Sequence, residues 1–359
     1  MKKKMLYYSL LLAFLLAAAA GIYMSGKKVR LPYADIMEKA AERHAAAAAL
    51  IKQERLSRGY PLAEEDRLGI GLLGLQTSPI TTSLGALDAK KTAQLPDFAA
   101  LCVRLFEEAG VKKGDRVGAC FSASFPGLDL AVLCAAEELG LRMVYHVSLG
   151  SSNYGANLPG YTIVEMIETA VSAGLISAMP QSVSMGGESD KGRNMQGYAL
   201  EETEEIEAMI RRLSEKGILL SEFDDYEENA LAQLEKMGDI KAFVNVGGNI
   251  LGLGNVDKSL SFGQGLLKPA DPPITPASGL VERCLSRGIP TIHLLNIKQL
   301  CAENGIAFDP AFLPEAGSEA VYFSRGYSRP AIAACGILAL AGIAVISRTG
   351  RKRRESAAA

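Results

Sequence analysis

Serine side chains stand at the end of a predicted buried strand, where they could act in nucleophilic catalysis or bind an anion. Residues 117–121 form a short apolar run and residues 126–139 have a helical pattern, so the predicted order is strand, turn and helix. A serine on such a turn lies beside free backbone N–H groups, which makes Ser124 a candidate nucleophile or anion ligand. Because Pro126 is a favourable first helical residue, Ser124 could instead be the helix N-cap. The turn lacks the Gly-x-Ser-x-Gly pattern, which favours a cap or ligand contact over catalysis.

A nucleophilic serine needs a base, and the central part of the chain offers two candidates, His293 and Asp190. His293 lies near the carboxyl end of an apolar segment, residues 289–295, that reads as a strand buried on both faces. A hydrogen-bonded core histidine is the favoured role there, yet His293 is the best acid/base candidate that the pattern provides. Asp190 lies in a polar loop at residues 181–192.

Three further loops are rich in Gly, Ser and Asn, and their amides, hydroxyls and backbone groups could bind a ligand. They are residues 148–160, 181–192 and 245–249, and turn chemistry alone is the alternative explanation for their composition. Consecutive glycines in two of them permit close backbone approach or an anion-binding nest. Together with the first turn, they supply the candidate ligand-binding residues Ser122, Ser151, Ser152, Asn153, Tyr154, Gly155, Asn157, Ser184, Gly186, Gly187, Asn245, Gly247, Gly248 and Asn249.

A fourth polar segment, residues 77–92, could offer threonine hydroxyls and the ammonium groups of Lys90 and Lys91 to an anion, or could be an exposed loop with solvated lysines. Just before it, the glycine spacing of residues 69–74 matches a nucleotide-binding fingerprint. No predicted strand precedes those glycines and two leucines lie between them, so packing is the favoured explanation. The sequence identifies no cofactor.

The elements that position these loops predict an α/β fold, Rossmann-like, with a mostly parallel sheet flanked by helices. Residues 115–147 read as strand, helix and strand, which is a parallel pair with a crossover helix. In such sheets ligands bind beyond the carboxyl ends of the strands, where the polar loops of this chain fall. Residues 34–58 predict a long alanine-rich helix, interpreted as a stalk that lifts the domain off a membrane.

Both ends of the chain carry apolar segments that are long enough to be membrane helices. Residues 5–24 and 330–346 contain no charged residue, and basic residues lie beyond them at each terminus. This pattern predicts two transmembrane helices with both termini cytoplasmic and the main domain extracytoplasmic. A cleaved signal peptide is the alternative for the first segment. The predicted organisation is an anchor at 1–30, a helical stalk at 31–60, an α/β domain at 61–328 or two lobes at 61–195 and 196–328, and a transmembrane helix with a basic tail at 329–359.

The charge of the central region argues against nucleic acid as a partner. Residues 1–30 hold six basic and no acidic residues and residues 348–359 hold five basic and one acidic, so the total of −2 leaves −12 on the rest. The six cysteines show no CxxC spacing, and no metal site is predicted. Most lie in apolar patterns, which favours buried free thiols.

Seven sequence blocks resemble the bacterial poly-gamma-glutamate system protein family, which accompanies the membrane synthase of that capsule polymer. The blocks are residues 77–92, 96–117, 122–140, 148–160, 184–192, 243–249 and 288–297. The resemblance implies an accessory role in making, exporting or handling poly-gamma-glutamate, with the synthase and export proteins, the membrane and the polymer as partners. It assigns no catalytic residue. Where the family has Thr-Gly-Ser-Phe-Pro, this chain has Ser-Ala-Ser-Phe-Pro, which leaves less room beside Ala123.

Three functions are therefore open. The first is a membrane-anchored hydrolase or transferase that acts on gamma-glutamyl bonds, with Ser124 or a water as nucleophile and His293 or Asp190 as base. The second is a non-catalytic scaffold that organises the synthase complex. The third is a nucleotide-binding accessory domain, although the chain has no P-loop and no complete dinucleotide fingerprint.

Overall fold

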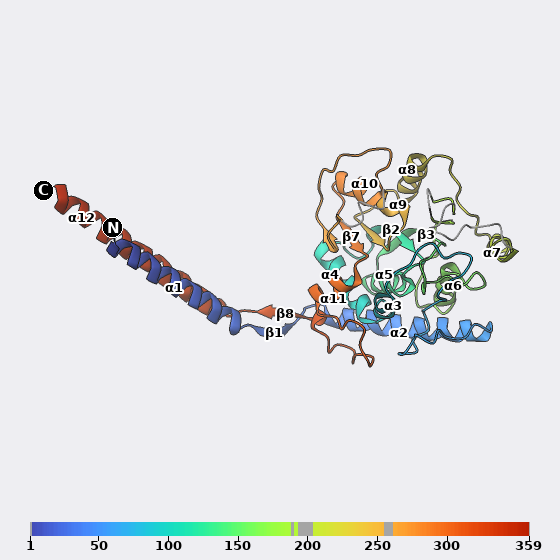
Figure 1. The fold of residues 1–359 in the computed structure, drawn as a ribbon, viewed down its shortest axis with the longest axis horizontal. Helices are drawn as coiled ribbons and strands as arrows, with labels where there is room; N and C mark the ends of the chain where they lie inside the picture. Colours follow the sequence, from blue (N-terminus) through green and yellow to red (C-terminus); the bar gives the residue numbers. More distant parts are fainter. Residues whose placement is uncertain (1, 188–189, 193–203, 255–260, 359) are drawn as a thin grey trace. The chain divides into compact units, whose positions relative to one another are not determined.

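A six-stranded sheet lies at the centre of the computed structural model, which describes residues 2–187, 190–192, 204–254 and 261–358. The strand order is β4-β3-β2-β5-β7-β6 (Figure 1). Every neighbouring pair is parallel except β6 with β7, so the predicted mostly parallel sheet is confirmed. The strands are β2 (Arg116–Ser122), β3 (Arg142–Ser148), β4 (Ser182–Ser184), β5 (Ala242–Val246), β6 (Gly265–Leu267) and β7 (Thr291–Leu294).

Helices cover both faces of the sheet (Figure 1). On one side α2 packs against α4, α5 and α6, and on the other α8, α9 and α10 enclose a second apolar layer. The helices are α2 (Ala34–Ser57), α3 (Leu87–Thr92), α4 (Asp97–Ala109), α5 (Pro126–Leu139), α6 (Ile163–Ser172), α7 (Glu204–Glu215), α8 (Tyr226–Met237), α9 (Ile250–Leu253), α10 (Leu280–Ser286) and α11 (Ile297–Asn304).

Local sequence signals set several helix ends. Gly140 follows α5 in the left-handed conformation with φ 64°, which a glycine adopts at little cost. At the start of α6 the sequence Thr162-x-x-Glu165 forms a capping box, because the Thr162 backbone N–H donates to Glu165 at 2.9 Å and the threonine side chain accepts from the third helical residue. The glycine ends α5 between β2 and β3, which form the predicted parallel pair with a crossover helix.

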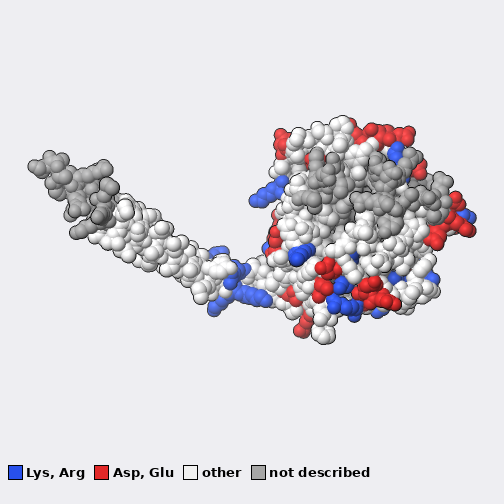
Figure 2. Space-filling view, in the orientation of Figure 1, with Lys and Arg blue, Asp and Glu red and all other residues white. Residues whose placement is uncertain are grey.

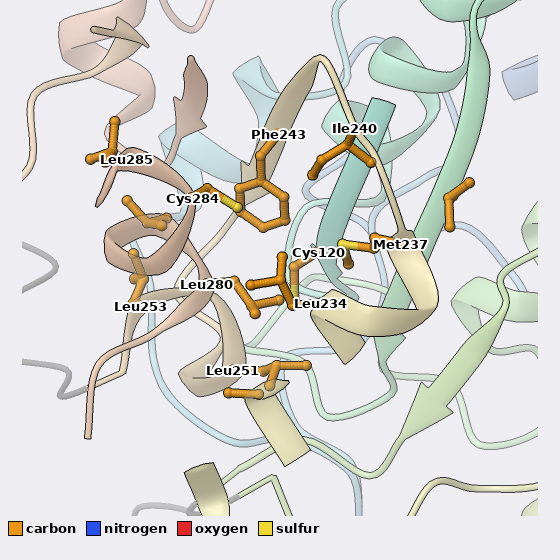
Figure 3. Packing of buried hydrophobic residues seen from close by; sticks show 13 residues of the cluster. Cys120, Leu234, Met237, Ile240, Phe243, Leu251, Leu253, Leu280, Cys284 and Leu285 are labelled. Atoms are coloured by element: carbon orange, nitrogen blue, oxygen red, sulfur yellow. The ribbon is translucent and has the colours of Figure 1, made fainter. Parts of the chain in front are cut away.

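The core on the α8 side is built around Phe243 and Cys120 from neighbouring strands (Figure 3). Leu234 and Met237 of α8 close it from one direction, and Leu280 of α10 closes it from another. All of these side chains are at most 3% exposed, so this layer fixes the strands whose ends carry the polar loops. Five of the six cysteines are buried, and all six are free thiols, as predicted.

The helix predicted as a stalk is instead part of the α/β unit. Helix α2 is present and packs against α4 and α5, with five of its eight alanines buried. His44 is fully buried too, with its Nε2 2.9 Å from the Gly127 carbonyl oxygen. Alanine leaves room for close helix contact, so an alanine-rich stripe can be a buried face. Residues Pro32–Tyr322 form one compact unit, which corrects both the separate stalk and the division into two lobes.

Other differences concern short elements. Strand β4 lies in the segment predicted as a loop at 181–192, and β6 lies at 255–277, where scattered Gly and Pro also predict a loop. The charged segment 201–216 predicts a helix, which the structure has as α7. Residues 188–189, 255–260 and 201–203 of these segments are outside the described residues. Helix α3 was also predicted as a loop. Elements of three to six residues carry too little periodicity for sequence patterns to identify them.

The two chain ends form a second unit of their own. Helices α1 (Lys2–Met24) and α12 (Arg329–Ala358) lie side by side and antiparallel, joined by the pairing of β1 (Lys27–Arg30) with β8 (Phe323–Gly326). Their apolar segments, Met5–Met24 and Arg329–Ile346, are long enough to cross a membrane and are not buried by the rest of the chain. Figure 2 shows Lys and Arg side chains gathered around the β1–β8 ribbon, where the apolar helices begin.

Candidate functional site

A cavity of about 410 Å³ opens at the carboxyl ends of the parallel strands, where the sequence places its polar loops. Strands β2 and β3 end in it with Ser122 and Ser148, and the turn after β5 reaches it with Gly248. One wall comes from the segment before and within α3. The lining residues are Thr82, Ser83, Leu84, Gly85, Ala86, Ala89, Lys90, Ser122, Ser124, Phe125, Ser148, Gly150, Ser152, Gly187, Gly248, Asn249, Ile250 and Leu295.

Among the described residues, Lys90 is the one lysine that lines this cavity, and it is only 3% exposed. Its Nζ donates to Ser152 Oγ at 2.5 Å and to the Ser124 carbonyl oxygen at 2.5 Å. The same ammonium group lies 3.8 Å from the centroid of the Phe125 ring, a cation–π contact. Helix α3 holds Lys90 in this place, while the neighbouring Lys91 points to Asp309 at 3.0 Å.

Burial lowers the pKa of Lys90 to about 7, because the charged ammonium group loses its hydration, and the carboxylate of Asp129 partly opposes this. Asp129, in the first turn of α5, is fully buried, and neither carboxylate oxygen has a hydrogen-bond partner among the described residues. Burial raises the pKa of Asp129 well above its usual range, while Lys90 opposes that rise. A substantial fraction of Lys90 is therefore neutral near pH 7 and able to accept a proton.

Three serine hydroxyls connect the lysine to the turn after β2. Ser122 Oγ donates to Ser124 Oγ at 3.0 Å, and the Ser152 backbone N–H donates to the same oxygen at 2.9 Å. The hydroxyl hydrogen of Ser124 has no acceptor among the described residues, and Ser124 lines the cavity, so it can donate to a ligand oxygen. The N-cap of α5 is Phe125, so the cap role predicted for Ser124 is wrong.

This arrangement can perform nucleophilic catalysis. Ser152 Oγ lies within hydrogen-bond reach of an amine that is partly neutral at pH 7, which is the geometry required of a nucleophile and its base. Serine–lysine pairs are among the known variants of the serine hydrolase triad. This geometry makes Ser152, which the sequence proposes only as a ligand contact, the candidate nucleophile, and makes Lys90 the candidate base.

Two predicted ligand residues clamp loops together. Asn153 accepts from the Gly85 backbone N–H at 2.6 Å and donates to the Gly85 carbonyl oxygen at 3.3 Å. Asn157 does the same with the backbone of Leu75, at 2.8 Å in both directions. The side-chain amides of both residues hydrogen-bond to backbone groups, and neither residue lines the cavity. They hold the segment at 75–85 against the loop that carries Ser152.

The remaining residues of that loop also make internal contacts. Ser151 Oγ donates to the Ala123 carbonyl oxygen at 3.1 Å, and Tyr154, with φ 57°, donates from its hydroxyl to Glu65 at 2.8 Å. A Cβ atom on Gly155 would lie 2.2 Å from Ser151 Oγ and 2.6 Å from the Ala123 oxygen. Gly155 therefore permits close contact between two protein loops.

The predicted bases lie apart from the lysine. His293 is fully buried, and its Nδ1 is 3.1 Å from Asn245 Nδ2, while Nε2 has no partner among the described residues. Burial lowers the pKa of His293 to about 4. Asp190 accepts from Ser184 Oγ at 2.5 Å in a separate buried cluster. Neither residue lines the cavity or hydrogen-bonds to Ser124.

Some residues of the turn after β5 line the cavity, and others make only contacts within the protein. Gly248 and Asn249 line the cavity, and Asn249 also caps α9 by accepting from the Gly252 N–H at 2.6 Å. Asn245 donates to the Gly247 carbonyl oxygen at 3.0 Å and does not line the cavity. Gly247 has φ 77° and its α carbon faces Ser122 too closely for a side chain. From the loop after β4, Gly187 lines the cavity whereas Gly186 packs against Ser148.

Sequence reasoning identified Lys90 only as one of two lysines that could face an anion. Nothing in the local pattern separates Lys90 from Lys91, because they are adjacent residues of the same six-residue helix. Their different roles arise from contacts with Ser152 and Asp309, 62 and 218 residues away in the chain.

The fold and the site define a class: an α/β protein with a mostly parallel sheet and a buried serine–lysine pair in a cavity at its carboxyl edge. Comparisons with models of protein families, with curated proteins and with solved structures find no match for the chain.

Proposed function

We propose that the protein is a membrane-anchored acyl hydrolase or acyltransferase in which Ser152 is the nucleophile and Lys90 is the general base. The observation that carries the proposal is the 2.5 Å contact between Lys90 Nζ and Ser152 Oγ inside a cavity at the carboxyl edge of the sheet. Ser152 Oγ bonds to the carbonyl carbon of an amide or ester, and its proton passes to neutral Lys90. The ammonium group then protonates the leaving amine or alcohol as the carbonyl–leaving group bond breaks.

The acyl group leaves the enzyme in a second step. Water, or an acceptor amine in the case of transfer, attacks the Ser152 ester, gives its proton to Lys90, and Ser152 recovers its own proton. The Ser124 hydroxyl can donate to the oxygen of the tetrahedral intermediate, because its hydrogen has no acceptor within the described part of the chain. The resemblance to poly-gamma-glutamate system proteins supports gamma-glutamyl amides as the substrate, and the synthase and export proteins as partners in the membrane.

A fluorophosphonate probe, which reacts covalently with activated serine hydroxyls, tests this function on the full chain in membranes. Wild-type protein is expected to be labelled on Ser152, as located by mass spectrometry of the modified peptide. Ser152→Ala is expected to abolish labelling, whereas Ser151→Ala removes a neighbouring hydroxyl whose hydrogen bonds go to backbone oxygens and should leave labelling intact. Labelling of Ser124 in place of Ser152 would reassign the nucleophile, and no labelling of either would favour the scaffold function.

The terminal unit supports an orientation in which both termini are cytoplasmic and residues 32–322 are extracytoplasmic. The two apolar helices are antiparallel, so their outer ends share one side of the membrane. Residues 2–4 and 348–354 hold eight Lys and Arg, against five in residues 27–30 and 325–329. The more basic side is expected to face the cytoplasm.

Protease added to intact cells is therefore expected to cleave the region 32–322 and to spare an epitope fused after Ala359. If the orientation is the reverse, the protease should remove the epitope after Ala359 and spare the region 32–322 until the cells are lysed. Cleavage of both the region and the epitope would show that the cells were permeable, so a cytoplasmic protein is followed in parallel as the control.

A further inference from the structure

A closed ring of buried polar side chains lies behind one wall of the cavity. Its members come from β3, β4, α8 and the turn after β4, and all are at most 7% exposed. Going round the ring they are His146, Ser184, Asp190, Asn229, Gln233 and Ser182. Because these side chains are buried and contact one another, each hydrogen bond in the ring needs a donor hydrogen from one of its members.

The Asp190 carboxylate sets the orientation of the side-chain amides of Asn229 and Gln233, which lead round one side of the ring to His146. Asn229 Nδ2 lies 3.0 Å from Asp190 Oδ2 and must donate to it, which leaves Asn229 Oδ1 to accept from Gln233 Nε2 at 3.2 Å. The Gln233 oxygen then faces Ser182 Oγ at 2.6 Å, and Ser182 must donate its only hydrogen there. Ser182 has none left for His146, whose Nδ1 lies 2.9 Å away. His146 Nδ1 must therefore carry a hydrogen.

The other arm gives the same result for the second ring nitrogen. Ser184 Oγ lies 2.5 Å from Asp190 Oδ1, a separation typical of a hydroxyl donating to a carboxylate. Its single hydrogen is used in that bond, so the contact of 3.0 Å with His146 Nε2 requires the nitrogen to donate. With both nitrogens as donors, His146 is an imidazolium. Its Nε2 is 3.7 Å from Asp190 Oδ2, which gives the charge a partner.

We infer that His146 and Asp190 form a buried imidazolium–carboxylate pair, and that this ring is a positioning device that fixes the β4 side of the cavity. Ser148 lines the cavity, and its Oγ donates to Asp190 Oδ1 at 3.4 Å. The Leu149 and Gly150 N–H groups donate to the carbonyl oxygens of Ser184 and Met185, at 2.9 and 2.8 Å. The pair thereby couples the turn after β4 to the loop that carries Ser152. The link to catalysis rests on the proposed function, while the ring itself does not.

Some of the groups around His146 lower its pKa and another raises it. Burial lowers the pKa of His146, the Asp190 carboxylate opposes this by favouring the charged ring, and Lys236 of α8 adds to the lowering. The side chain opposite in β2, Cys120, is a neutral thiol because burial raises its pKa well above its usual range. Ser148, Ser184 and Asn229 all donate to Asp190, which favours its ionised form. Beside that carboxylate, a neutral His146 would leave two acceptors facing each other inside the ring.

Selective ¹⁵N labelling of histidine in the full chain, solubilised in detergent, tests the inference directly. The chain has three histidines. Burial lowers the pKa of both His44 and His293 to about 4, so those rings are neutral near neutral pH. At about pH 7.5, where an ordinary histidine is mostly neutral, one ring is expected to show two protonated nitrogens and the other two rings one each. Asp190→Asn should convert the charged ring to a neutral one.

Three neutral rings in the wild-type spectrum would overturn the inference, and this result does not depend on any variant folding. His146→Gln assigns the signals, since it removes the charged ring if the inference holds. Failure of the proposed function is distinguishable: an imidazolium with no probe labelling of Ser152 would leave the ring intact and remove its link to catalysis. With labelling present, Asp190→Asn is expected to slow it by roughly tenfold or more, the size of effect that misplaced catalytic groups produce.

Discussion

Lys90→Met is expected to lower the rate of fluorophosphonate labelling of Ser152 by about 100-fold or more, the range over which general bases contribute to catalysis. Methionine keeps most of the length and apolar character of the lysine stem, so the buried site stays filled. It removes the amine that takes the Ser152 proton and the two hydrogen bonds that hold Ser152 and Ser124 together. The measurement is the labelling rate at several pH values with full-length protein in membranes.

Lys91→Met is the matched control. Lys91 is the next residue in α3 and its ammonium group pairs with Asp309, away from the serines. The same substitution there should leave the labelling rate within about twofold, because rim charges and surface ion pairs contribute little to a site that they do not touch. Equal losses in both variants would mean that Lys90 acts through the stability of α3 and would remove it as the base.

The serine turn and the parallel unit were predictable because their signals are local. An apolar run, a Pro at the first helical position and a Gly in the left-handed region define β2, α5 and β3 within 33 residues of each other. In a parallel sheet the carboxyl ends of the strands meet at one edge, so the location of the cavity followed from strand order without knowledge of the side chains that line it.

The pairing of Lys90 with Ser152 was not predictable, because it depends on contacts between residues far apart in the sequence. Lys90 lies beside Ser152 where Asn153 and Asn157 hold the segment at 75–85 against the loop after β3, and these contacts join residues 62 to 82 positions apart. An amide that binds a ligand and an amide that binds a distant backbone have the same sequence signature. Likewise, the alanines of α2 read as a solvated helix, although they form a buried face.

Charge on Asp129 is expected to set the pH at which the site becomes reactive. Labelling needs neutral Lys90, so the rate should rise with pH through about 7, the pKa to which burial lowers Lys90. The carboxylate of Asp129 favours the ammonium form and raises that pKa. Asp129→Asn removes the carboxylate at nearly constant volume. The midpoint of the pH–rate profile should then move to lower pH by roughly one unit, a change typical of the loss of one nearby opposite charge.

The maximal labelling rate of Asp129→Asn shows which of the two residues, Asp129 or Lys90, accepts the proton. If Asp129 were the proton acceptor and Lys90 only held it in place, Asp129→Asn would abolish labelling at every pH. If Lys90 is the base, the maximal rate persists and only the midpoint falls. Asp88→Asn removes the same charge from an exposed position in α3 and should leave the midpoint unchanged, because solvent screens a surface charge from the buried amine. An unshifted midpoint in Asp129→Asn, with the maximal rate retained, would show either that Asp129 is already protonated near pH 7, in line with its raised pKa, or that the group titrating there is not Lys90.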